Sequence, residues 1–448
     1  MGNGRRAIYV NCDGLGREWV TGEFTPFLYE AACRNLWCAD HSAVFPSVTR
    51  PSAASVATGC YPCRHGLHGN RMGLMEQGKI IVRDVGNPDF RDHMRRATGG
   101  TLRVPTLAER VAEVGGFVGF SNVSPGAAYF LDPEHFGHIY HRAGSYAPGG
   151  DPIGGVDALN VTHDLAGDRA MTRRFCSEVL LDRRPAVAVL WLANPDLTLH
   201  GTPLGSPAHR EALCETERNV LEVLQTVERL RTDGEEILLL IGSDHGQETI
   251  GDCVDVEAWL STHGLGALVD AGDVAVAGQG TAALLYATDK GRADLLDLLD
   301  VMREQPWAGE VVTERELAEL GHAARAGVVA AVNMARREDP NAYGVPGQRW
   351  TVAEPGKPAA IGSGQHGGWG QDETRPFLIL NDGGISSGTL QRSTGLVDIA
   401  PTILAFLGLA TDGLDGTSLL GLSPVQAETR RDRFARTGRA ASSRSERG

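Results

Sequence analysis

Five short apolar runs recur along the 448-residue chain, and longer amphipathic stretches separate them. Runs of this length, bounded by glycine and proline, are typical of strands that are buried on both faces of a parallel sheet. The stretches between them are typical of helices that cover such a sheet. The alternation predicts an α/β fold with a central, mostly parallel sheet flanked by helices. The expected strands are Ala7–Cys12, Phe117–Asn122, Ala186–Ala193, Glu236–Gly242 and Pro376–Asn381.

One internal segment departs from this pattern. Residues 254–354 carry short elements of their own without chemically suggestive residues, which predicts a smaller inserted cap subdomain. The core then comprises residues 1–253 and 355–422, and residues 423–448, with little to bury, are expected to form a mobile tail. The expected core helices are Pro26–Asn35, Ser52–Thr58, Thr106–Val114, Arg169–Leu181, Ala208–Arg231 and Val397–Leu407. The expected insertion elements are strands Thr281–Tyr286 and Gly327–Val332 and helix Ala293–Met302.

Composition and charge exclude several classes of partner. The net charge of -14 argues against binding a nucleic-acid polymer, which needs a basic face. A small anionic substrate stays compatible, because a bound metal ion can reverse the local sign of charge. No signal-peptide core and no run of about 18 apolar residues occurs, so no membrane contact is expected. The eight cysteines lack framework spacing, which predicts reduced thiols in a cytoplasmic protein. Monomer and homodimer both stay open.

Aspartate and histidine residues follow the expected strands at the points where the strands end. Because the carboxyl ends of parallel strands meet at one edge of a sheet, these side chains are expected to converge there. Taken singly, each has an ordinary alternative role as a helix cap, a turn residue or a surface residue. The repetition at three strand ends favours a shared site. The residues are Asp13, Asp196, His200, Asp244 and His245 at the strand ends, and His366 in the glycine-rich turn 362–368.

Such a set of side chains predicts a metal centre. Gathered carboxylates and imidazoles without lysine would repel one another and lose hydration, and a divalent cation such as zinc removes both costs. Six ligands exceed what one tetrahedral zinc ion takes, but they suit two sites.

Thr49 is a candidate nucleophile. Pro51 is expected at the first position of a helix, which places Thr49 just ahead of a helix N-terminus, where free N–H groups favour an anion. Metal coordination lowers the pKa of a threonine hydroxyl without a general base. The alternative role for Thr49 is that of an ordinary residue beside a helix cap.

These features, in this order, resemble the alkaline phosphatase superfamily, in its type I phosphodiesterase/nucleotide pyrophosphatase branch and near phosphonoacetate hydrolase. The segment Phe45–Asn70, FPSVTRPSAASVATGCYPCRHGLHGN, is similar to the nucleophile segment of that branch. The resemblance covers about Ile8–Ile250 and Gly362–Leu422 and skips most of the insertion.

The resemblance implies a role for each candidate residue. Thr49 would attack phosphorus to give a covalent phospho-threonine, which water then hydrolyses, and Asn70 would donate a hydrogen bond to a non-bridging oxygen. Arg50 is a candidate second contact to the substrate. Two divalent ions, zinc foremost, are implied: Asp196, His200 and His366 would hold one, and Asp13, Asp244, His245 and the Thr49 hydroxyl the other.

The sequence also departs from the family patterns. Leu199 stands where the phosphodiesterases usually have glycine, and the segment 119–126 has none of the lysines with which phosphonoacetate hydrolase grips its carboxylate, so Arg142 or another arginine would have to substitute. Cys60 and Cys63 fit the core of a sulfatase signature, but the sequence that should follow is missing.

The expected function is hydrolysis of a phosphodiester or pyrophosphate bond, with a nucleotide as one possible substrate. The alternatives are a phosphomonoesterase on the same core, a phosphonoacetate-type phosphonate hydrolase, and a non-catalytic binding protein on the same fold.

Overall fold

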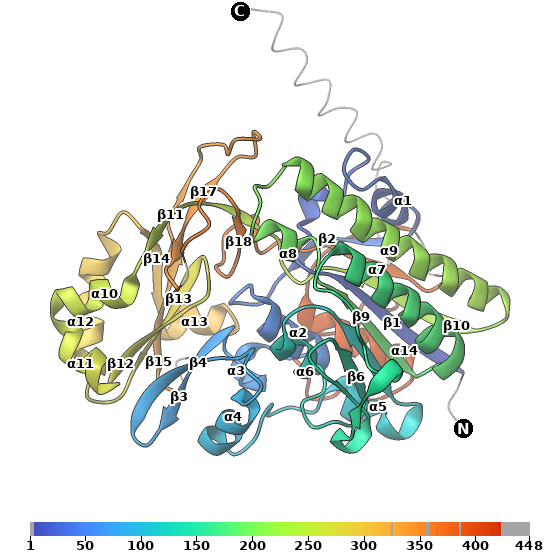
Figure 1. Cartoon of the computed structure of the whole chain (residues 1–448), viewed down its shortest axis with the longest axis horizontal. Helices are drawn as coiled ribbons and strands as arrows, with labels where there is room; N and C mark the ends of the chain where they lie inside the picture. Colours follow the sequence, from blue (N-terminus) through green and yellow to red (C-terminus); the bar gives the residue numbers. More distant parts are fainter. Residues whose placement is uncertain (1–3, 324–325, 355, 357, 385–386, 423–448) are drawn as a thin grey trace, which may run out of the picture.

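Alternating side chains along strand β1 (Arg5–Cys12) show why a central sheet forms. Ala7 and Tyr9 belong to one apolar cluster, Ile8 and Val10 belong to another, and all four are fully buried. Because successive side chains of a strand point to opposite faces, such a strand needs cover on both faces. The computed structural model, which describes residues 4–323, 326–354, 356, 358–384 and 387–422, provides this cover with helices on each side (Figure 1).

The central sheet contains all five expected strands, as β1, β5, β9, β10 and β19. The strands β10, β1, β9, β5 and β6 are parallel neighbours, whereas β19 runs antiparallel to β10 and β2. The sheet is therefore mostly parallel, as predicted. Its order is β20 (Gly388–Gly395), β2 (Leu36–Ser42), β19 (Leu378–Asn381), β10 (Glu236–Gly242), β1, β9 (Val187–Leu192), β5 (Phe117–Ser121), β6 (His138–His141), β7 (Ser145–Tyr146) and β8 (Pro152–Ile153).

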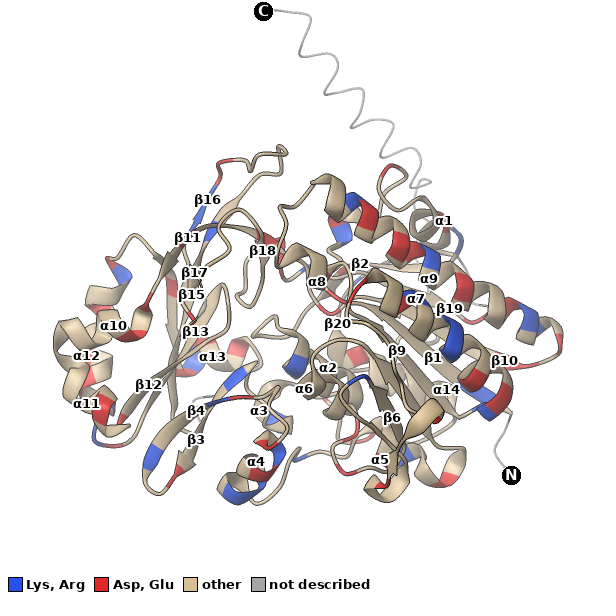
Figure 2. Ribbon diagram, in the orientation of Figure 1, with Lys and Arg blue, Asp and Glu red and all other residues tan. Residues whose placement is uncertain are grey.

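Helices cover the two faces of this sheet with separate apolar clusters. Figure 2 shows acidic and basic residues interspersed along the ribbon of the long helix α9, as expected for an amphipathic helix with one face in solvent. One face is covered by α1 (Pro26–Arg34), α7 (Leu165–Arg174) and α9 (Pro207–Thr232). The other face is covered by α2 (Thr49–Thr58), α5 (Leu107–Val111), α6 (Pro125–Tyr129) and α14 (Ile399–Phe406).

The insertion folds around a second, antiparallel sheet with its own core. Its strands, in sheet order, are β12 (Val274–Gly278), β13 (Ala282–Ala287), β15 (Val328–Met334) and β14 (Ala308–Thr313). Its helices are α10 (Val256–Leu260), α11 (Gly266–Ala271), α12 (Arg292–Arg303) and α13 (Glu314–Glu319). Helices α10, α11 and α12 pack on the outer face of the sheet, whereas α13 lies with Phe45 and the core hairpin of β3 (Arg71–Glu76) and β4 (Lys79–Asp84) on its inner face (Figure 1).

A small mixed sheet straddles the expected boundaries between core and insertion. It joins strands from both sides of each boundary, so the cut points near residues 254 and 354 stay a prediction. The tail expected at 423–448 lies outside the described residues. The strands, in order, are β16 (Arg336–Arg337), β17 (Gln348–Val352), β11 (Glu248–Val254) and β18 (Gly364–Gln365).

Several elements differ from expectation. Helix α2 begins at Thr49 rather than at Pro51, because the first N–H groups of a helix have no intrahelical partner and proline therefore fits anywhere in the first turn. The helix expected over Arg169–Leu181 begins earlier and passes into a π-helical turn after Arg174. The structure adds β2 and β20, the hairpin β3 (Arg71–Glu76) and β4 (Lys79–Asp84), and the short helices α3 (Pro62–His65), α4 (Phe90–Thr98) and α8 (Asp196–Leu199).

Candidate metal centre

The ends of β1 and β10 bring three of the candidate ligands together. The strands are paired in register, with Asn11 opposite Gly242, so Asp13, Asp244 and His245 leave the sheet at the same edge. The Nε2 atom of His245 lies 3.5 Å from Asp13 Oδ1 and 3.3 Å from Asp244 Oδ2. All three side chains are fully buried.

The end of β9 and the turn after β18 bring the other three candidates to the same place. The backbone N–H of Asp196 donates to the Asp13 carbonyl at 3.1 Å, which fixes the two carboxylates side by side. Asp196 Oδ2 lies 3.2 Å from His200 Nε2, and its Oδ1 lies 3.3 Å from His366 Nε2. The rings of His366 and His245 stack with centroids 3.6 Å apart.

The ligand atoms form two compact groups that share one histidine. Asp13, Asp244 and His245 form one group, and Asp196, His245 and His366 form the other, each with ligand atoms within 4.8 Å of one another. His200 belongs to neither group, although its ring centroid lies 5.3 Å from that of His366, and its side chain is 39% exposed. The division of ligands between two ions, with His200 beside His366, therefore stays a prediction.

The hydrogen bonds of the two buried histidines show that a cation fits here. His245 Nδ1 lies 3.0 Å from the Gly246 carbonyl, and His366 Nδ1 lies 2.7 Å from the Ser47 carbonyl, so both Nδ1 atoms carry the proton. The neutral ring of His245 then presents the lone pair of Nε2 to the carboxylates of Asp13 and Asp244, and His366 Nε2 faces Asp196 Oδ1 at 3.3 Å. Lone pairs that face carboxylates repel them unless a cation lies between, and this donor set suits a divalent ion such as zinc.

The carboxylates give the same indication. Asp13 Oδ1 and Asp244 Oδ2 are buried and accept no hydrogen bond from any described residue. Burial, with the nearby carboxylates, raises the pKa of Asp13 well above its usual range, and burial raises the pKa of Asp244 to about 7. Burial also lowers the pKa of His245 well below its usual range, so its imidazole is neutral, the form that binds metal.

Thr49 lies directly against this cluster. As the first residue of α2 it is only 7% exposed, and its Oγ1 lies 3.3 Å from His245 Nε2. Ser47 joins the segment before Thr49 to the turn that carries His366, because its Oγ donates to the Gly368 carbonyl at 2.7 Å. The hydroxyl of Thr49 and the candidate metal ligands are therefore held in one rigid unit.

Asn70 and Arg50 lie next to one another at the edge of the cluster. The backbone N–H of Arg50 donates to Asn70 Oδ1 at 3.2 Å, so the side-chain amide nitrogen of Asn70 is the atom that can donate to a substrate. The Arg50 guanidinium binds Asp84 Oδ1 and the Asn70 carbonyl, both at 2.5 Å, and Ser124 Oγ at 3.1 Å. Its hydrogen bonds support the protein itself, and its predicted contact to the substrate stays a prediction.

Two residues that support Asp196 were not expected from the sequence. Gln247 donates its side-chain N–H to Asp196 Oδ1, and the carboxylate of Asp168 accepts hydrogen bonds from the segment just before Asp196. Gln247 could have been found from its position two residues after His245. Asp168 gave no signal, because helix α7 brings it to the site from a distance in the sequence.

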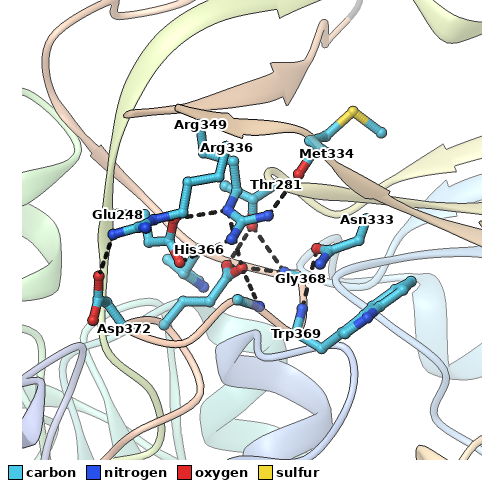
Figure 3. A network of polar contacts seen from close by, with 12 residues as sticks. Glu248, Thr281, Asn333, Met334, Arg336, Arg349, His366, Gly368, Trp369 and Asp372 are labelled. Carbon is cyan, nitrogen blue, oxygen red and sulfur yellow. Dashed lines mark hydrogen bonds and ion pairs between the residues drawn. The ribbon is translucent and has the colours of Figure 1, made fainter. Parts of the chain in front are cut away.

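The turn that carries His366 is anchored to the insertion by a buried network of charges (Figure 3). Arg349 of β17 makes two hydrogen bonds to Glu248, at 2.8 and 3.1 Å. Glu373 lies 3.6 Å from the Arg349 guanidinium, and it accepts hydrogen bonds from the N–H groups of Gly368 and Gly370 at 3.0 and 2.9 Å. Folding of the insertion and placement of His366 are thereby coupled.

The sequence as a whole matches a known family. Residues 7–368 match the model described as type I phosphodiesterase / nucleotide pyrophosphatase. The chain belongs to this family. Membership confirms the resemblance carried by Phe45–Asn70. It places the chain in a family of metal-dependent phosphoester hydrolases.

Solved structures of this type I phosphodiesterase fold are similar along nearly their whole length. Murine ectonucleotide pyrophosphatase/phosphodiesterase 5 has a TM-score of 0.67 at 14% identity, over 92% of this chain and 97% of that chain. Phosphonoacetate hydrolase from Sinorhizobium meliloti 1021, in complex with phosphonoformate, has a TM-score of 0.64 at 16% identity, over 92% and 98%. At these identities the likeness shows the fold.

One match of higher sequence identity spans only a short segment of the chain. A pyrophosphatase/phosphodiesterase of Schizosaccharomyces pombe is 32% identical over 78 residues, which is 17% of this chain and 16% of the yeast protein. Among the described residues of this family member, no helix is both long and apolar enough to cross a bilayer.

Proposed function

We propose that this chain is a two-metal hydrolase that cleaves a phosphodiester or pyrophosphate bond in a small phosphorylated substrate, with Thr49 as the nucleophile. The observation that carries the proposal is the environment of His245 Nε2, which faces two buried carboxylates and the Thr49 hydroxyl at 3.3 to 3.5 Å. Carboxylate oxygens, an imidazole nitrogen and a hydroxyl are ligand atoms that suit a divalent cation. The hydroxyl belongs to Thr49, at the N-terminus of α2.

The chain's own residues divide the work of such a reaction. Asp13, Asp244, His245, Asp196, His200 and His366 would hold two divalent ions, zinc foremost. When bound, these ions supply positive charge that lowers the pKa of the attacking hydroxyl and offsets charge on the apical oxygens. The N-terminus of α2 favours the anionic phosphoryl group, and the Asn70 amide donates to one of its non-bridging oxygens.

The proposed reaction has two steps. The Thr49 oxygen forms a bond to phosphorus while the bond from phosphorus to the leaving oxygen breaks, and the leaving group departs with that electron pair and takes up a proton. Water then attacks the phospho-threonine, which releases the phosphoryl product and restores the Thr49 hydroxyl.

Two related structures support a small phosphorylated substrate. The murine protein is known as an inactive threonine-to-alanine variant in complex with AMP, and the Sinorhizobium enzyme is known in complex with phosphonoacetate. We therefore infer a nucleotide-type ester or pyrophosphate as the first candidate. Phosphonate hydrolysis is the second, because the phosphonoacetate hydrolase fold is similar at a nearly equal TM-score.

The deciding experiment compares zinc-loaded protein on bis(4-nitrophenyl) phosphate, on 4-nitrophenyl phosphate and on phosphonoacetate. We expect a diester preference of about a hundredfold, which corresponds to about 2.7 kcal/mol of transition-state discrimination. A monoester preference would make the protein a phosphatase, and turnover of phosphonoacetate alone would make it a phosphonate hydrolase.

The nucleophile is tested with two variants at one position. Thr49→Ala should lose at least about a thousandfold in diester turnover while it keeps its bound metal, and Thr49→Ser should recover part of the activity. Retained turnover in Thr49→Ala would contradict the nucleophile assignment.

We also propose a cytoplasmic location. All eight cysteines are free thiols in the structure, and four of them are buried in the fold. Free thiols are typical of a reducing compartment. Alkylation and mass spectrometry of protein taken from its native cells test this, and a disulfide found there would contradict it.

A further inference from the structure

A cavity of about 350 Å³ opens beside the candidate metal centre. His200 and His366 line it, together with Asn70 and Arg50 of the core. The insertion contributes residues 278–280 and 351–354 to the lining. The part of a substrate that extends beyond the reacting phosphorus would therefore contact both units.

Arg71, the residue after Asn70, also lines this cavity. Its side chain is half-buried and makes no hydrogen bond or ion pair with any described residue. The neighbouring Arg50 differs, because Asp84, Ser124 and a backbone carbonyl already use its guanidinium. A guanidinium that lines a cavity without a protein partner keeps its hydrogen-bond donors for a ligand.

The acidic residues of the cavity wall act on Arg50. Asp84 pairs with Arg50 at 2.5 Å. Burial lowers the pKa of Arg50, and the charges of Asp84 and Glu354 oppose that shift. These two are the only acidic side chains among the described residues that line the cavity, so Arg71 is the cation there without an acidic contact.

The insertion holds Arg71 in place through Gln279. The side chain of Gln279 accepts a hydrogen bond from the Asn70 N–H at 2.8 Å and donates one to the Arg71 carbonyl at 2.7 Å. Gln279 is only 3% exposed. One buried amide therefore fixes the backbone conformation of the expected phosphoryl contact, Asn70, and of Arg71.

We propose that Arg71 binds a second anionic group of the substrate, a phosphate or a carboxylate, and selects substrates that carry one. The proposal rests on the proposed function, because it places the reacting phosphorus at Thr49 and Asn70. Planar guanidinium groups bind both anions through paired hydrogen bonds, so the two sources share one chemistry. Arg71 is a specificity residue that takes no part in bond breaking.

The test uses the zinc-loaded full chain as wild type, Arg71→Gln and Lys79→Gln. Lys79 is an exposed cation at the tip of the same hairpin, so its variant controls for loss of one charge. ATP supplies a second phosphate, phosphonoacetate supplies a carboxylate, and bis(4-nitrophenyl) phosphate supplies neither. For each, kcat/KM is measured, and the Kd of ATP and of phosphonoacetate is measured by calorimetry in the Thr49→Ala background.

We expect Arg71→Gln to weaken binding and kcat/KM about 10- to 100-fold for the substrate with the second anion, and less than about threefold for the aryl diester. An effect on ATP alone identifies phosphate, and an effect on phosphonoacetate alone identifies carboxylate. Equal losses on all three substrates, unchanged Kd values, or the same losses in Lys79→Gln would overturn the proposal. If wild-type protein turns over none of them, the proposed function fails, and the Kd values still decide the role of Arg71.

Discussion

The carboxylate of Asp168 illustrates how a residue outside the metal cluster can determine its geometry. It is 1% exposed and accepts hydrogen bonds from the N–H groups of Ala193 and Asn194 at 3.0 to 3.2 Å and from the side chains of Asn122 and Asn194 at 2.9 to 3.0 Å. Every partner is a donor, so an acceptor-only group is required. Through them, Asp168 fixes the segment that ends at Asp196.

Asp168→Asn should therefore weaken metal binding. The new amide places an N–H group among donors, which leaves at least one buried group unsatisfied and displaces the segment before Asp196. We expect zinc affinity to fall about 10- to 100-fold, as for other partners of metal ligands. Titration with a competing zinc chelator measures this.

Asp164→Asn provides the matched control for Asp168→Asn. Asp164 caps the same helix by accepting from the Gly167 N–H at 2.8 Å, and asparagine caps helices equally well. Its zinc affinity should equal that of wild type. Equal affinities in both variants would contradict the role of Asp168.

At the scale of elements, the turn from His366 to Glu373 depends on a glycine. Gly367 has a φ of +129°, and a Cβ atom there would lie 1.6 Å from the Gln279 carbonyl oxygen, which belongs to the insertion. The contact leaves no room for any side chain. The turn that carries a candidate metal ligand is thereby packed directly onto the insertion.

Gly367→Ala should displace His366 and lower both metal content and turnover. Gly344→Ala is the control, because Gly344 has a φ of +78° with open space around its Cβ position. The control pays only the conformational cost, about 1–2 kcal/mol. Metal analysis and thermal unfolding of both variants decide the matter, and equal metal content would contradict the expectation.

The sequence predicted those strands and helices well whose residues show a clear pattern of apolar side chains within the element itself. The runs around Val10 and Leu240 are apolar enough to identify buried strands, and the aspartates after them follow from the rule that parallel strands end at one edge. The start of α2 was placed two residues late, because proline is compatible with several positions of a first turn. The antiparallel direction of β19 depends on strand pairing, which no local pattern encodes.

The sequence also indicated the candidate ligands but not the residues that support them. Asp13, Asp244 and His245 stand beside recognisable strands. Gln247, Asp168 and Arg71 acquire their meaning only from contacts with residues distant in the chain, such as the clamp that Gln279 forms on Arg71. Ordinary side chains of this kind carry no pattern before the fold is known.

At the scale of the whole molecule, the insertion and the core act as one unit. The insertion supplies Gln279 to the backbone of Asn70, Arg349 to the network beneath His366, and one wall of the cavity. If the insertion were a lid that opens and closes, its surface towards the core would have to separate from the core. Here the contacts between the two units pass through buried charges and reach a candidate metal ligand.

Metal removal should therefore destabilise the whole chain as well as stop turnover. Without cations, one buried oxygen each of Asp13 and Asp244 accepts no hydrogen bond from any described residue, and His245 Nε2 faces both at 3.3 to 3.5 Å. A metal ion at 100 times its Kd stabilises the folded state by about 2.7 kcal/mol per site. We expect a chelator to lower the Tm and abolish diester turnover, and zinc to restore both. His366→Ala provides the control: it should hold fewer than two metals per chain and show a smaller shift in Tm. Two fully occupied metal sites in that variant, or a wild-type Tm that the chelator does not change, would contradict the metal centre.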